Sequence, residues 1–371
     1  MKKIMIAAGG TGGHIFPGLA VAKIFLDQGD AVVWVGTKKG LETRLVPEQG
    51  IRLLTISMQG LRGKGIARLI KAPLLMLRAV HEARCLIKQE SPDLILGMGG
   101  YVSAPVGVAA RLCGVPLVIH EQNAIAGLSN KLLSRLAYRI CVSFPNTFPA
   151  SDKIILSGNP VRGAIAEVKK EASNNSVLNV LVLGGSLGAK PINQVIPDLL
   201  IRANGMLNVW HQTGVEDFES VKAAYGKICG GVITPLPLGE RGWGEGGTAM
   251  LYKVEPFISD MASAYAWADI IICRAGATTV AELAILGLSA ILIPLPHAVD
   301  DHQTANARHL VRQGSAVILP QSELSSERLL HEIHAFLLHR KDNEQSIIHA
   351  PEPNHAEAAS KVVQVCKEVM A

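Results

Sequence analysis

Short apolar runs alternate with longer amphipathic segments through the first half of the chain. The runs predicted to be strands are Lys3–Ala8, Ala31–Val35, Leu94–Leu96 and Val115–His120, and the segments predicted to be helices are Phe16–Gln28 and Ser103–Cys113. Each predicted helix stops at a glycine, Gly29 or Gly114, which is a common way for helices to end. Strands that are covered on both faces are apolar throughout rather than alternating. The first half therefore predicts a doubly wound α/β sheet of parallel strands.

The same pattern restarts in the second half. A predicted strand at Val177–Leu183 runs into a Gly-Gly loop, as the first strand of the chain does. An Asp-led strand, a glycine turn, an Ala/Val-rich helix and a second apolar strand occur at 93–119 and again at 269–293. This repetition predicts two Rossmann-like domains with the active site in the cleft between them.

The predicted boundary lies close to Ser157–Arg162. We assign residues 1–160 to an N-terminal domain and 161–350 to a C-terminal domain. The segment 356–370 is predicted to be a helix that packs back on the N-terminal domain, because a polar linker precedes it. The Gly-rich segment 235–248 shows no periodicity and is predicted to be a surface insertion.

Composition narrows the class of protein. The chain has 371 residues, of which 49% are hydrophobic and 18% charged, so it can build real cores and is not disordered. The net charge of +5 is mild, and neither zinc-finger spacing nor an aromatic-rich basic stripe indicates nucleic acid. The apolar stretch that follows Lys2 and Lys3 ends after Ala8, which is too short for a signal peptide. No apolar run is long enough to predict a membrane-spanning helix.

A glycine-rich loop, Gly9–His14, lies between the first predicted strand and the first predicted helix. Glycines let a ligand approach the backbone closely, and a helix start offers free N–H groups to an anion. The spacing fits neither a dinucleotide fingerprint nor a P-loop. Similar loops follow other predicted strands at 97–101, 184–186 and 274–278. A single loop of this kind can be a tight turn without a ligand, but their recurrence at strand ends favours a phosphorylated substrate.

Polar side chains accompany these loops. The first half offers His14, Tyr101 and the segment His120–Asn123, and the second half offers Ser186, Asn193, Glu282, Gln303 and Asn306. Glu282 could hold the paired hydroxyls of a ribose, or it could be an ordinary solvated helix residue. The segment 297–302 contains two histidines and two aspartates, but its spacing matches no compact metal motif, and polar turn residues explain it more simply. We therefore expect no metal site.

The segment 61–84 combines basic residues with leucine and isoleucine, against the single acid Glu82. A basic helix with an apolar face is typical of a surface that rests on anionic lipid. The alternative is a helix that packs on the core and has a solvated basic side.

Taken in order, several segments resemble the MurG family of N-acetylglucosaminyltransferases over nearly the whole chain. These segments are Gly9–His14 with Pro17 and Gly18, Gly97–Tyr101, His120–Asn123, Asn159–Arg162, Gly184–Ala189 and Arg274–Glu282. The resemblance implies the GT-B architecture of two Rossmann-like domains. It also implies transfer of GlcNAc from UDP-GlcNAc to the C4 hydroxyl of the muramoyl sugar of lipid I, which gives lipid II for peptidoglycan synthesis.

The same resemblance implies a donor site and its residues. Main-chain groups of Ile258 would meet the uracil, Glu282 the ribose hydroxyls, and Arg162 the diphosphate. The residues implied for UDP-GlcNAc are Thr11, Gly12, Gly13, Asn123, Arg162, Ser186, Phe257, Ile258, Ala277, Thr278, Thr279, Val280, Ala281, Glu282 and Gln303. The residues implied for the acceptor are Gly99, Gly100 and Tyr101.

Inversion at the anomeric carbon, which the resemblance implies, needs a general base for the acceptor hydroxyl. His14 is the first candidate, because a histidine suits this task near neutral pH, and Glu121 is the second. No Asp-x-Asp motif is evident, so no cofactor or metal is expected to be obligatory. The implied location is peripheral, on the cytoplasmic face of the bacterial plasma membrane, with the segment 61–84 on the anionic surface. Two alternatives remain open: a non-hydrolysing UDP-GlcNAc 2-epimerase, and a nucleotide-sugar-binding protein without catalysis.

Overall fold

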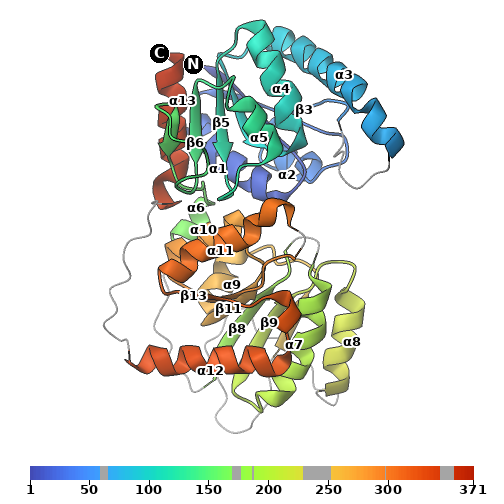
Figure 1. The fold of residues 1–371 in the computed structure, drawn as a ribbon, viewed down its shortest axis with the longest axis vertical. Helices are drawn as coiled ribbons and strands as arrows, with labels where there is room; N and C mark the ends of the chain where they lie inside the picture. The colour runs from blue at the N-terminus through green and yellow to red at the C-terminus, as the bar shows by residue number, and fades with distance from the viewer. Residues whose placement is uncertain (59–65, 169–176, 186–187, 229–251, 297, 343–354) are drawn as a thin grey trace. The chain divides into compact units, whose positions relative to one another are not determined.

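The computed structural model describes residues 1–58, 66–168, 177–185, 188–228, 252–296, 298–342 and 355–371. Within helices and strands, the side chains of 66–71, 228, 299 and 339–342 also lie outside the description. The chain divides into two compact units, drawn in Figure 1. Unit 1 comprises Met1–Gly163 and Pro351–Ala371, and unit 2 comprises Ala164–Ala350. The segment 235–248 lies outside the described residues.

Among its described residues, unit 1 contains a parallel sheet of seven strands in the order β3-β2-β1-β4-β5-β6-β7. Its strands are β1 (Lys3–Ala8), β2 (Ala31–Gly36), β3 (Arg52–Thr55), β4 (Leu94–Gly99), β5 (Leu117–Glu121), β6 (Arg139–Val142) and β7 (Ile154–Leu156). Its helices are α1 (Gly12–Asp27), α2 (Glu42–Glu48), α3 (Ile66–Glu90), α4 (Gly100–Cys113), α5 (Leu128–Leu133) and α13 (Ala358–Met370), and α6 (Gly163–Ala166) crosses into unit 2. The last helix, α13, packs against α1.

Both faces of this sheet are covered, as the apolar strands predict. On β1, Ile4 and Ile6 belong to the core beneath α1 and α13, whereas Met5 and Ala7 belong to the core beneath α3 and α4. All four side chains are fully buried. Alternation of side chains along the strand thus supplies both cores from one apolar run.

The described part of unit 2 holds six parallel strands in the order β10-β9-β8-β11-β12-β13. They are β8 (Leu178–Leu183), β9 (Leu207–Gln212), β10 (Tyr252–Glu255), β11 (Ile270–Cys273), β12 (Ser289–Leu292) and β13 (Ala316–Ile318). The helices of this unit are α7 (Lys190–Arg202), α8 (Phe218–Ile228), α9 (Met261–Trp267), α10 (Ala277–Leu286), α11 (His302–Arg312) and α12 (Ser326–Asp342). The predicted fold class, two doubly wound parallel sheets, is confirmed.

Several predicted boundaries were wrong by a few residues, and the largest differences at helix starts lie at glycine loops. Helix α1 begins at Gly12 rather than at Phe16, and α4 begins at Gly100 rather than at Ser103. Sequence patterns penalise glycine in helices because its backbone is flexible, whereas here glycines form the first turns. His14 therefore lies in the first turn of α1 rather than at the tip of a loop.

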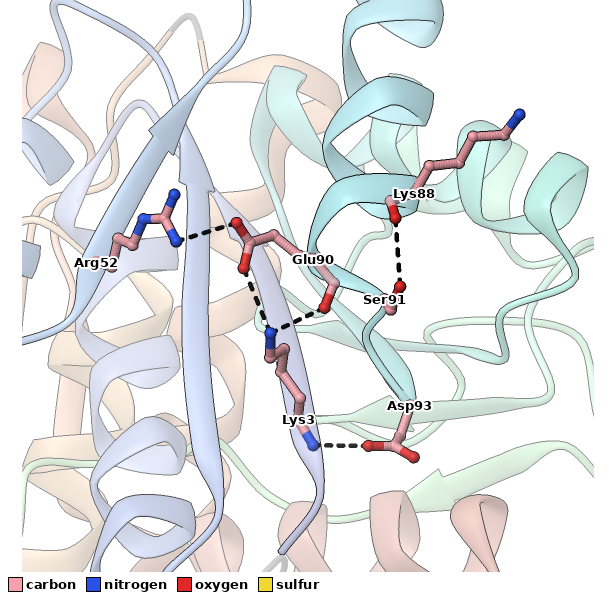
Figure 2. Close-up of polar contacts among 6 residues, drawn as sticks. All are labelled: Lys3, Arg52, Lys88, Glu90, Ser91 and Asp93. Carbon is pink, nitrogen blue, oxygen red and sulfur yellow. Dashed lines mark hydrogen bonds and ion pairs between the residues drawn. The ribbon is translucent and has the colours of Figure 1, made fainter.

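The amino edge of the sheet in unit 1 is fixed by a cluster of charged side chains (Figure 2). Glu90, at the end of α3 and only 6% exposed, pairs with Arg52 at 3.1 Å and with Lys3 Nζ at 3.5 Å. The backbone N–H of Lys3 donates to Asp93 Oδ2 at 2.7 Å, and Ser91 Oγ donates to the Lys88 carbonyl at 3.2 Å. These contacts fix the turn from α3 into β4. The glycine loops lie at the opposite, carboxyl edge of the same sheet.

Candidate active site

The first glycine loop joins β1 to α1 and is shaped by a buried carboxylate. Glu42 is fully buried and accepts hydrogen bonds from Gly10 N at 3.3 Å, Thr37 N at 2.9 Å and Thr37 Oγ1 at 2.8 Å. A Cβ atom on Gly9 would lie 2.8 Å from Glu42 Oε1, which leaves no room for a side chain there. Thr11 caps α1 with extended backbone and without a side-chain cap bond, and its carbonyl accepts from His14 N at 3.2 Å.

The second glycine loop, which joins β4 to α4, touches the first. A Cβ atom on Gly100 would lie 2.3 Å from the Gly9 carbonyl oxygen, and Gly100 has a φ of 76°. Gly10 lies beside the ring of Tyr101, whose Cε1 would be 3.3 Å from a Cβ atom there. Ser103 Oγ accepts from Gly99 N at 2.9 Å and lies 2.8 Å from the Ala7 carbonyl. The structure thus brings the predicted acceptor residues Gly99, Gly100 and Tyr101 together with the first loop.

His14 reaches the end of β5 from α1. Its Nδ1 lies 2.8 Å from Oε1 of Gln122, the residue that directly follows β5. Gln122 also contacts His120, which is completely buried. Burial lowers the pKa of His120 to about 4, so His120 is neutral near pH 7.

Glu121, the second candidate base, holds the loop that follows β5. One carboxylate oxygen accepts from Asn123 N at 3.1 Å and Asn123 Nδ2 at 3.2 Å. The other accepts from Gly127 N at 3.0 Å and Asn130 Nδ2 at 2.9 Å. The side chain is only 2% exposed. A carboxylate with this many N–H donors is suited to organising a loop, and its lone pairs are already used.

Arg162 belongs to unit 1 and stacks on α1. Its guanidinium carbon lies 4.8 Å from the centroid of the Phe16 ring. The same ring contacts Gly12, where a Cβ atom would come within 2.8 Å of Phe16 Cε2. The arginine is thus held over the first turn of α1. Its predicted contact with a diphosphate stays a prediction.

The third glycine loop, after β8, leads to α7 in unit 2. A Cβ atom on Gly188 would lie 2.2 Å from the Thr213 carbonyl oxygen, so this loop packs directly on the end of β9. Gln212, the last residue of β9, donates to the Gly185 carbonyl at 3.0 Å and accepts from Ile258 N at 3.0 Å. The Ile258 N–H is therefore already engaged, and its carbonyl is the group left for the predicted uracil contact. Phe257 beside it is 42% exposed. Ser186 lies outside the described residues.

Helix α10 carries the predicted ribose carboxylate. Glu282 is only 4% exposed, which excludes the solvated alternative, and Tyr265 of α9 donates its hydroxyl to Glu282 Oε2 at 2.7 Å. Gly276 caps the helix, and its carbonyl accepts from Val280 N at 2.9 Å. The helix therefore starts with the predicted run Ala277, Thr278, Thr279, Val280 and Ala281. The N–H groups of its first turn are the usual place for a phosphate.

The neighbouring α11 carries Gln303. Its Oε1 accepts from Leu295 N at 3.0 Å, which ties the start of α11 to the segment that follows β12. Arg274, which follows β11, donates to the carbonyls of Ile293 and Pro294 at 3.1 and 3.2 Å and to Gln321 Oε1 at 2.7 Å. Burial lowers the pKa of Arg274, as expected for a guanidinium that braces the fold. The contact of Gln303 with UDP-GlcNAc that the resemblance implies stays a prediction.

Two residues that position these groups were not singled out from the sequence, Gln212 and Tyr265, whereas Gln122 belongs to the predicted polar segment His120–Asn123. Gln212 ends a strand at the carboxyl edge, so the rule that highlighted the other polar residues could have found it too. Tyr265 gave no such signal, since it lies within a short helix. Within the described ranges, no three His, Cys, Asp or Glu side chains gather in a way that could hold a metal ion.

Comparisons with known proteins agree with this architecture. Residues 4–142 match the glycosyltransferase family 28 N-terminal domain, and residues 179–364 match the glycosyltransferase family 28 C-terminal domain. The chain is 46% identical to UDP-N-acetylglucosamine–N-acetylmuramyl-(pentapeptide) pyrophosphoryl-undecaprenol N-acetylglucosamine transferase of Ectopseudomonas mendocina (strain ymp), over 99% of this chain and 98% of that protein. The protein of the same name from Pseudomonas aeruginosa (strain LESB58) is also 46% identical, over the same shares of both chains.

The solved structures that match include one with high sequence identity and others that share only the fold. The crystal structure of Acinetobacter baumannii MurG matches with a TM-score of 0.75 and 40% identity, over 99% of this chain and 100% of that one. The UDP-GlcNAc 2-epimerase from Neisseria meningitidis, bound to UDP-GlcNAc, matches with a TM-score of 0.65 but only 12% identity, over 99% of this chain and 100% of that one. The second likeness shows a shared fold alone. The full-length matches at 40–46% identity decide the family: the chain belongs to glycosyltransferase family 28 and, within it, to the MurG family.

Proposed function

We propose that this chain transfers GlcNAc from UDP-GlcNAc to the muramoyl C4 hydroxyl of lipid I, forming lipid II for peptidoglycan synthesis. The observation that carries the proposal is 46% identity over 99% of the chain to transferases named for this reaction. No such identity supports the 2-epimerase alternative. The polar side chains of His14, Tyr101 and the segment His120–Asn123 in unit 1 argue against a protein that only binds the donor.

Unit 2 is proposed to bind the donor. The first turn of α10, after Gly276, offers N–H groups to the diphosphate, and the buried carboxylate of Glu282 accepts the ribose hydroxyls. Glu282 has one oxygen occupied by Tyr265, so its orientation is fixed before the nucleotide arrives. The carbonyl of Ile258 is proposed to receive the uracil N–H. The other donor residues that the resemblance implies in unit 2, Ser186 and Gln303 among them, are part of this proposal, whereas those in unit 1, Asn123 among them, stay predictions.

Unit 1 is proposed to bind the acceptor and to supply the base. His14 takes the proton of the C4 hydroxyl while the oxygen bonds to the anomeric carbon. The bond from that carbon to the diphosphate breaks on the opposite face, so the configuration inverts and UDP leaves with the electron pair. Arg162 and the helix N-termini favour the departing negative charge, so the reaction needs no obligatory metal in this proposal. Glu121 is less suited as the base because N–H donors already occupy both of its oxygens.

We further propose that α3 lies against anionic lipid on the cytoplasmic face of the plasma membrane. Ala79, Ala83 and Ile87 pack into the core, whereas Leu74 and Leu77 are 71% and 67% exposed. Helix α3 thus buries one face and still exposes two leucines. Exposure of apolar side chains to water costs free energy, which contact with lipid would recover. Lys64 and the side chains of Arg68 and Lys71 lie outside the description. In the part of the chain that the structure describes, no helix is long and apolar enough to cross a membrane.

The deciding experiment incubates the protein with labelled UDP-GlcNAc and a lipid I analogue, with and without a chelator. GlcNAc in the lipid product supports the proposal, and activity that survives chelation supports a metal-free mechanism. Epimerised UDP-sugar formed without the acceptor would establish the alternative function instead.

Variants then test the residues. Glu282→Ala should weaken UDP-GlcNAc binding by about 1.5–3 kcal/mol, the usual worth of a charged hydrogen bond, while the exposed Glu323→Ala leaves it unchanged. His14→Ala should lower kcat with little change in UDP binding. Equal losses of rate and of UDP binding would remove His14 as the base.

The membrane proposal has its own test. The double variant Leu74→Ser, Leu77→Ser should float less with vesicles that contain an anionic phospholipid. Leu338→Ser, which alters an equally exposed leucine of unit 2 (66%), is the control and should float like the wild type. Unchanged flotation of the double variant would contradict a role for α3.

A further inference from the structure

The side chain of Gln122 connects two histidines in unit 1. Its Oε1 lies 2.8 Å from His14 Nδ1, and its Nε2 lies 2.9 Å from His120 Nδ1. Nε2 also donates to the Met98 carbonyl at 2.9 Å, and His120 Nε2 lies 2.9 Å from the Gly158 carbonyl. Gln122 is 1% exposed and His120 is fully buried, so water does not compete for these contacts.

Two backbone carbonyls fix the direction of the hydrogen bonds that link His14, Gln122 and His120. A carbonyl can only accept, so the side of the Gln122 amide that faces Met98 must be its NH₂ group. For the same reason, the His120 nitrogen that faces Gly158 carries the hydrogen. Because buried His120 is neutral, its other nitrogen has a lone pair, and that lone pair accepts from Gln122 Nε2. The contact with the Met98 carbonyl and the contact with His120 thus require the same orientation of the Gln122 amide.

This orientation determines the state of His14. The amide oxygen of Gln122 faces His14 Nδ1, and an amide oxygen cannot donate. His14 Nδ1 must therefore carry the hydrogen, and in the neutral ring the lone pair then lies on Nε2. A free histidine in water prefers the opposite tautomer, so the protein selects the less common one.

The glycines of the second loop hold the ring in place. A Cβ atom on Gly99 would lie 2.8 Å from His14 Nδ1, and one on Gly100 would lie 3.4 Å from His14 Cδ2. Both glycines have positive φ, 99° and 76°. A side chain at Gly99 would displace the ring from the Gln122 oxygen, so the loop and the amide act on the same ring.

We propose that Gln122 is a positioning residue that holds His14 in the Nδ1–H tautomer and thereby makes Nε2 the atom that takes the acceptor's proton. This inference rests on the proposed function. In the step, the O–H bond of the acceptor breaks, its proton moves to His14 Nε2, and the oxygen's electron pair forms the bond to the anomeric carbon. The bond from that carbon to the diphosphate breaks at the same time, and UDP leaves with its electron pair. The new positive charge on His14 is spread toward Nδ1–H, which continues to donate to Gln122 Oε1. Replacing Gln122 removes the tautomer preference, although His14 itself remains.

Nitrogen-15 NMR of histidine-labelled full-length protein reads this tautomer directly, without substrate. The spectrum is recorded at pH 8, above the ordinary pKa of histidine, and the His14 signals are identified by their loss in His14→Ala. The wild type should show a protonated Nδ1 and an unprotonated Nε2. Gln122→Met, which has no acceptor, should move the proton to Nε2, whereas Gln122→Glu keeps an acceptor and should keep the hydrogen on Nδ1. Gln49→Met, a change of an exposed glutamine, is the control for both spectrum and rate.

Kinetics complete the test. Gln122→Met should lower kcat at least about tenfold and leave the KM for UDP-GlcNAc unchanged, and Gln122→Glu should restore part of the rate. A wild-type His14 protonated on Nε2 would overturn the proposal, as would a Gln122→Met enzyme with normal kcat. Failure of the proposed function is recognised separately, because it would appear as no GlcNAc transfer by the wild-type protein.

Discussion

Acidification should destabilise unit 2 through His211, a histidine whose ring is completely buried. Its Nδ1 lies 3.1 Å from the Tyr225 hydroxyl, and its Nε2 lies 3.0 Å from Asn193 Oδ1. Burial lowers the pKa of His211 to about 3, against an ordinary value of 6.5. The unfolded chain therefore binds a proton at a pH where the folded unit does not. The stability that the neutral ring contributes is complete above pH 6.5 and is lost as the pH falls toward about 3.

The size of the effect follows from the two pKa values. At pH 5, about 1.5 units below the ordinary pKa, the folded ring is still neutral. One pKa unit is worth about 1.36 kcal/mol, so His211 alone should cost unit 2 about 2 kcal/mol between pH 7 and pH 5. Burial also lowers the pKa of His309 in the same unit, so a variant is needed to isolate His211. Asp198 and Asp260, whose pKa values are lowered by hydrogen bonds, act at lower pH than this window.

Urea denaturation at pH 7 and pH 5, with hydrogen exchange followed in β8 and β9, measures the stability of unit 2. His211→Phe keeps an aromatic ring but cannot bind a proton. It should be less stable at pH 7, because Asn193 loses a partner, yet its loss on going to pH 5 should be about 2 kcal/mol smaller than that of the wild type. His331→Phe changes a histidine whose side chain is 72% exposed and should leave the pH dependence unaltered. If His211→Phe and the wild type lose the same free energy, the reasoning is refuted.

Three substitutions should have separable effects. Gly100→Ala places a methyl group 2.3 Å from the Gly9 carbonyl at a φ of 76°, so it should lower both the melting temperature and kcat. Tyr265→Phe releases the carboxylate of Glu282 and should raise the KM for UDP-GlcNAc by about 2–10-fold, the worth of one hydrogen bond, without changing the KM for lipid I. Glu90→Gln removes the charge that pairs with two cations at the amino edge (Figure 2), and it should lower the free energy of unfolding of unit 1 by about 1–3 kcal/mol in urea.

Each of these substitutions has a matched control within the chain. Gly29→Ala shares the positive φ (81°) but meets nothing within 4 Å, so a loss as large as that of Gly100→Ala would contradict the proposed clash. Tyr138→Phe alters an exposed tyrosine and should leave the KM for UDP-GlcNAc unchanged, unlike Tyr265→Phe. Glu48→Gln alters an exposed carboxylate and should change stability far less than Glu90→Gln.

The strands of the fold could be predicted because burial on both faces leaves a continuous apolar run. Lys3–Ala8 was predicted with the bounds that the structure gives to β1. Strand β9 was not predicted, since its run Leu207–Gln212 is interrupted by Asn208, His211 and Gln212. All three polar side chains are buried and hydrogen-bonded, so their cost of burial is offset by partners that local sequence cannot reveal.

In the candidate site, too, some features could be predicted from the sequence and others could not. Residue types at strand ends indicated that His14 and the glycine loops of unit 1 would lie at one edge of its sheet, because parallel strands share a carboxyl edge. Their partners could not be predicted, since a hydrogen bond depends on how distant segments approach. Gln122 lies 108 residues from His14, and Gln212 lies 46 residues from Ile258.

Units 1 and 2 use the same kind of side chain to connect segments at the carboxyl edges of their sheets. Each uses a glutamine at the end of a strand to join neighbouring segments at the sheet edge, Gln122 after β5 and Gln212 in β9. A carboxamide donates on one side and accepts on the other, so one side chain can join a carbonyl of one loop to an N–H of another. At these two positions a carboxylate could accept but not donate, so the hydrogen bond to the Met98 or Gly185 carbonyl would be lost. The amide is therefore the side chain that makes both bonds, which is why glutamate at either position should support UDP-GlcNAc turnover less well than glutamine even where the fold survives.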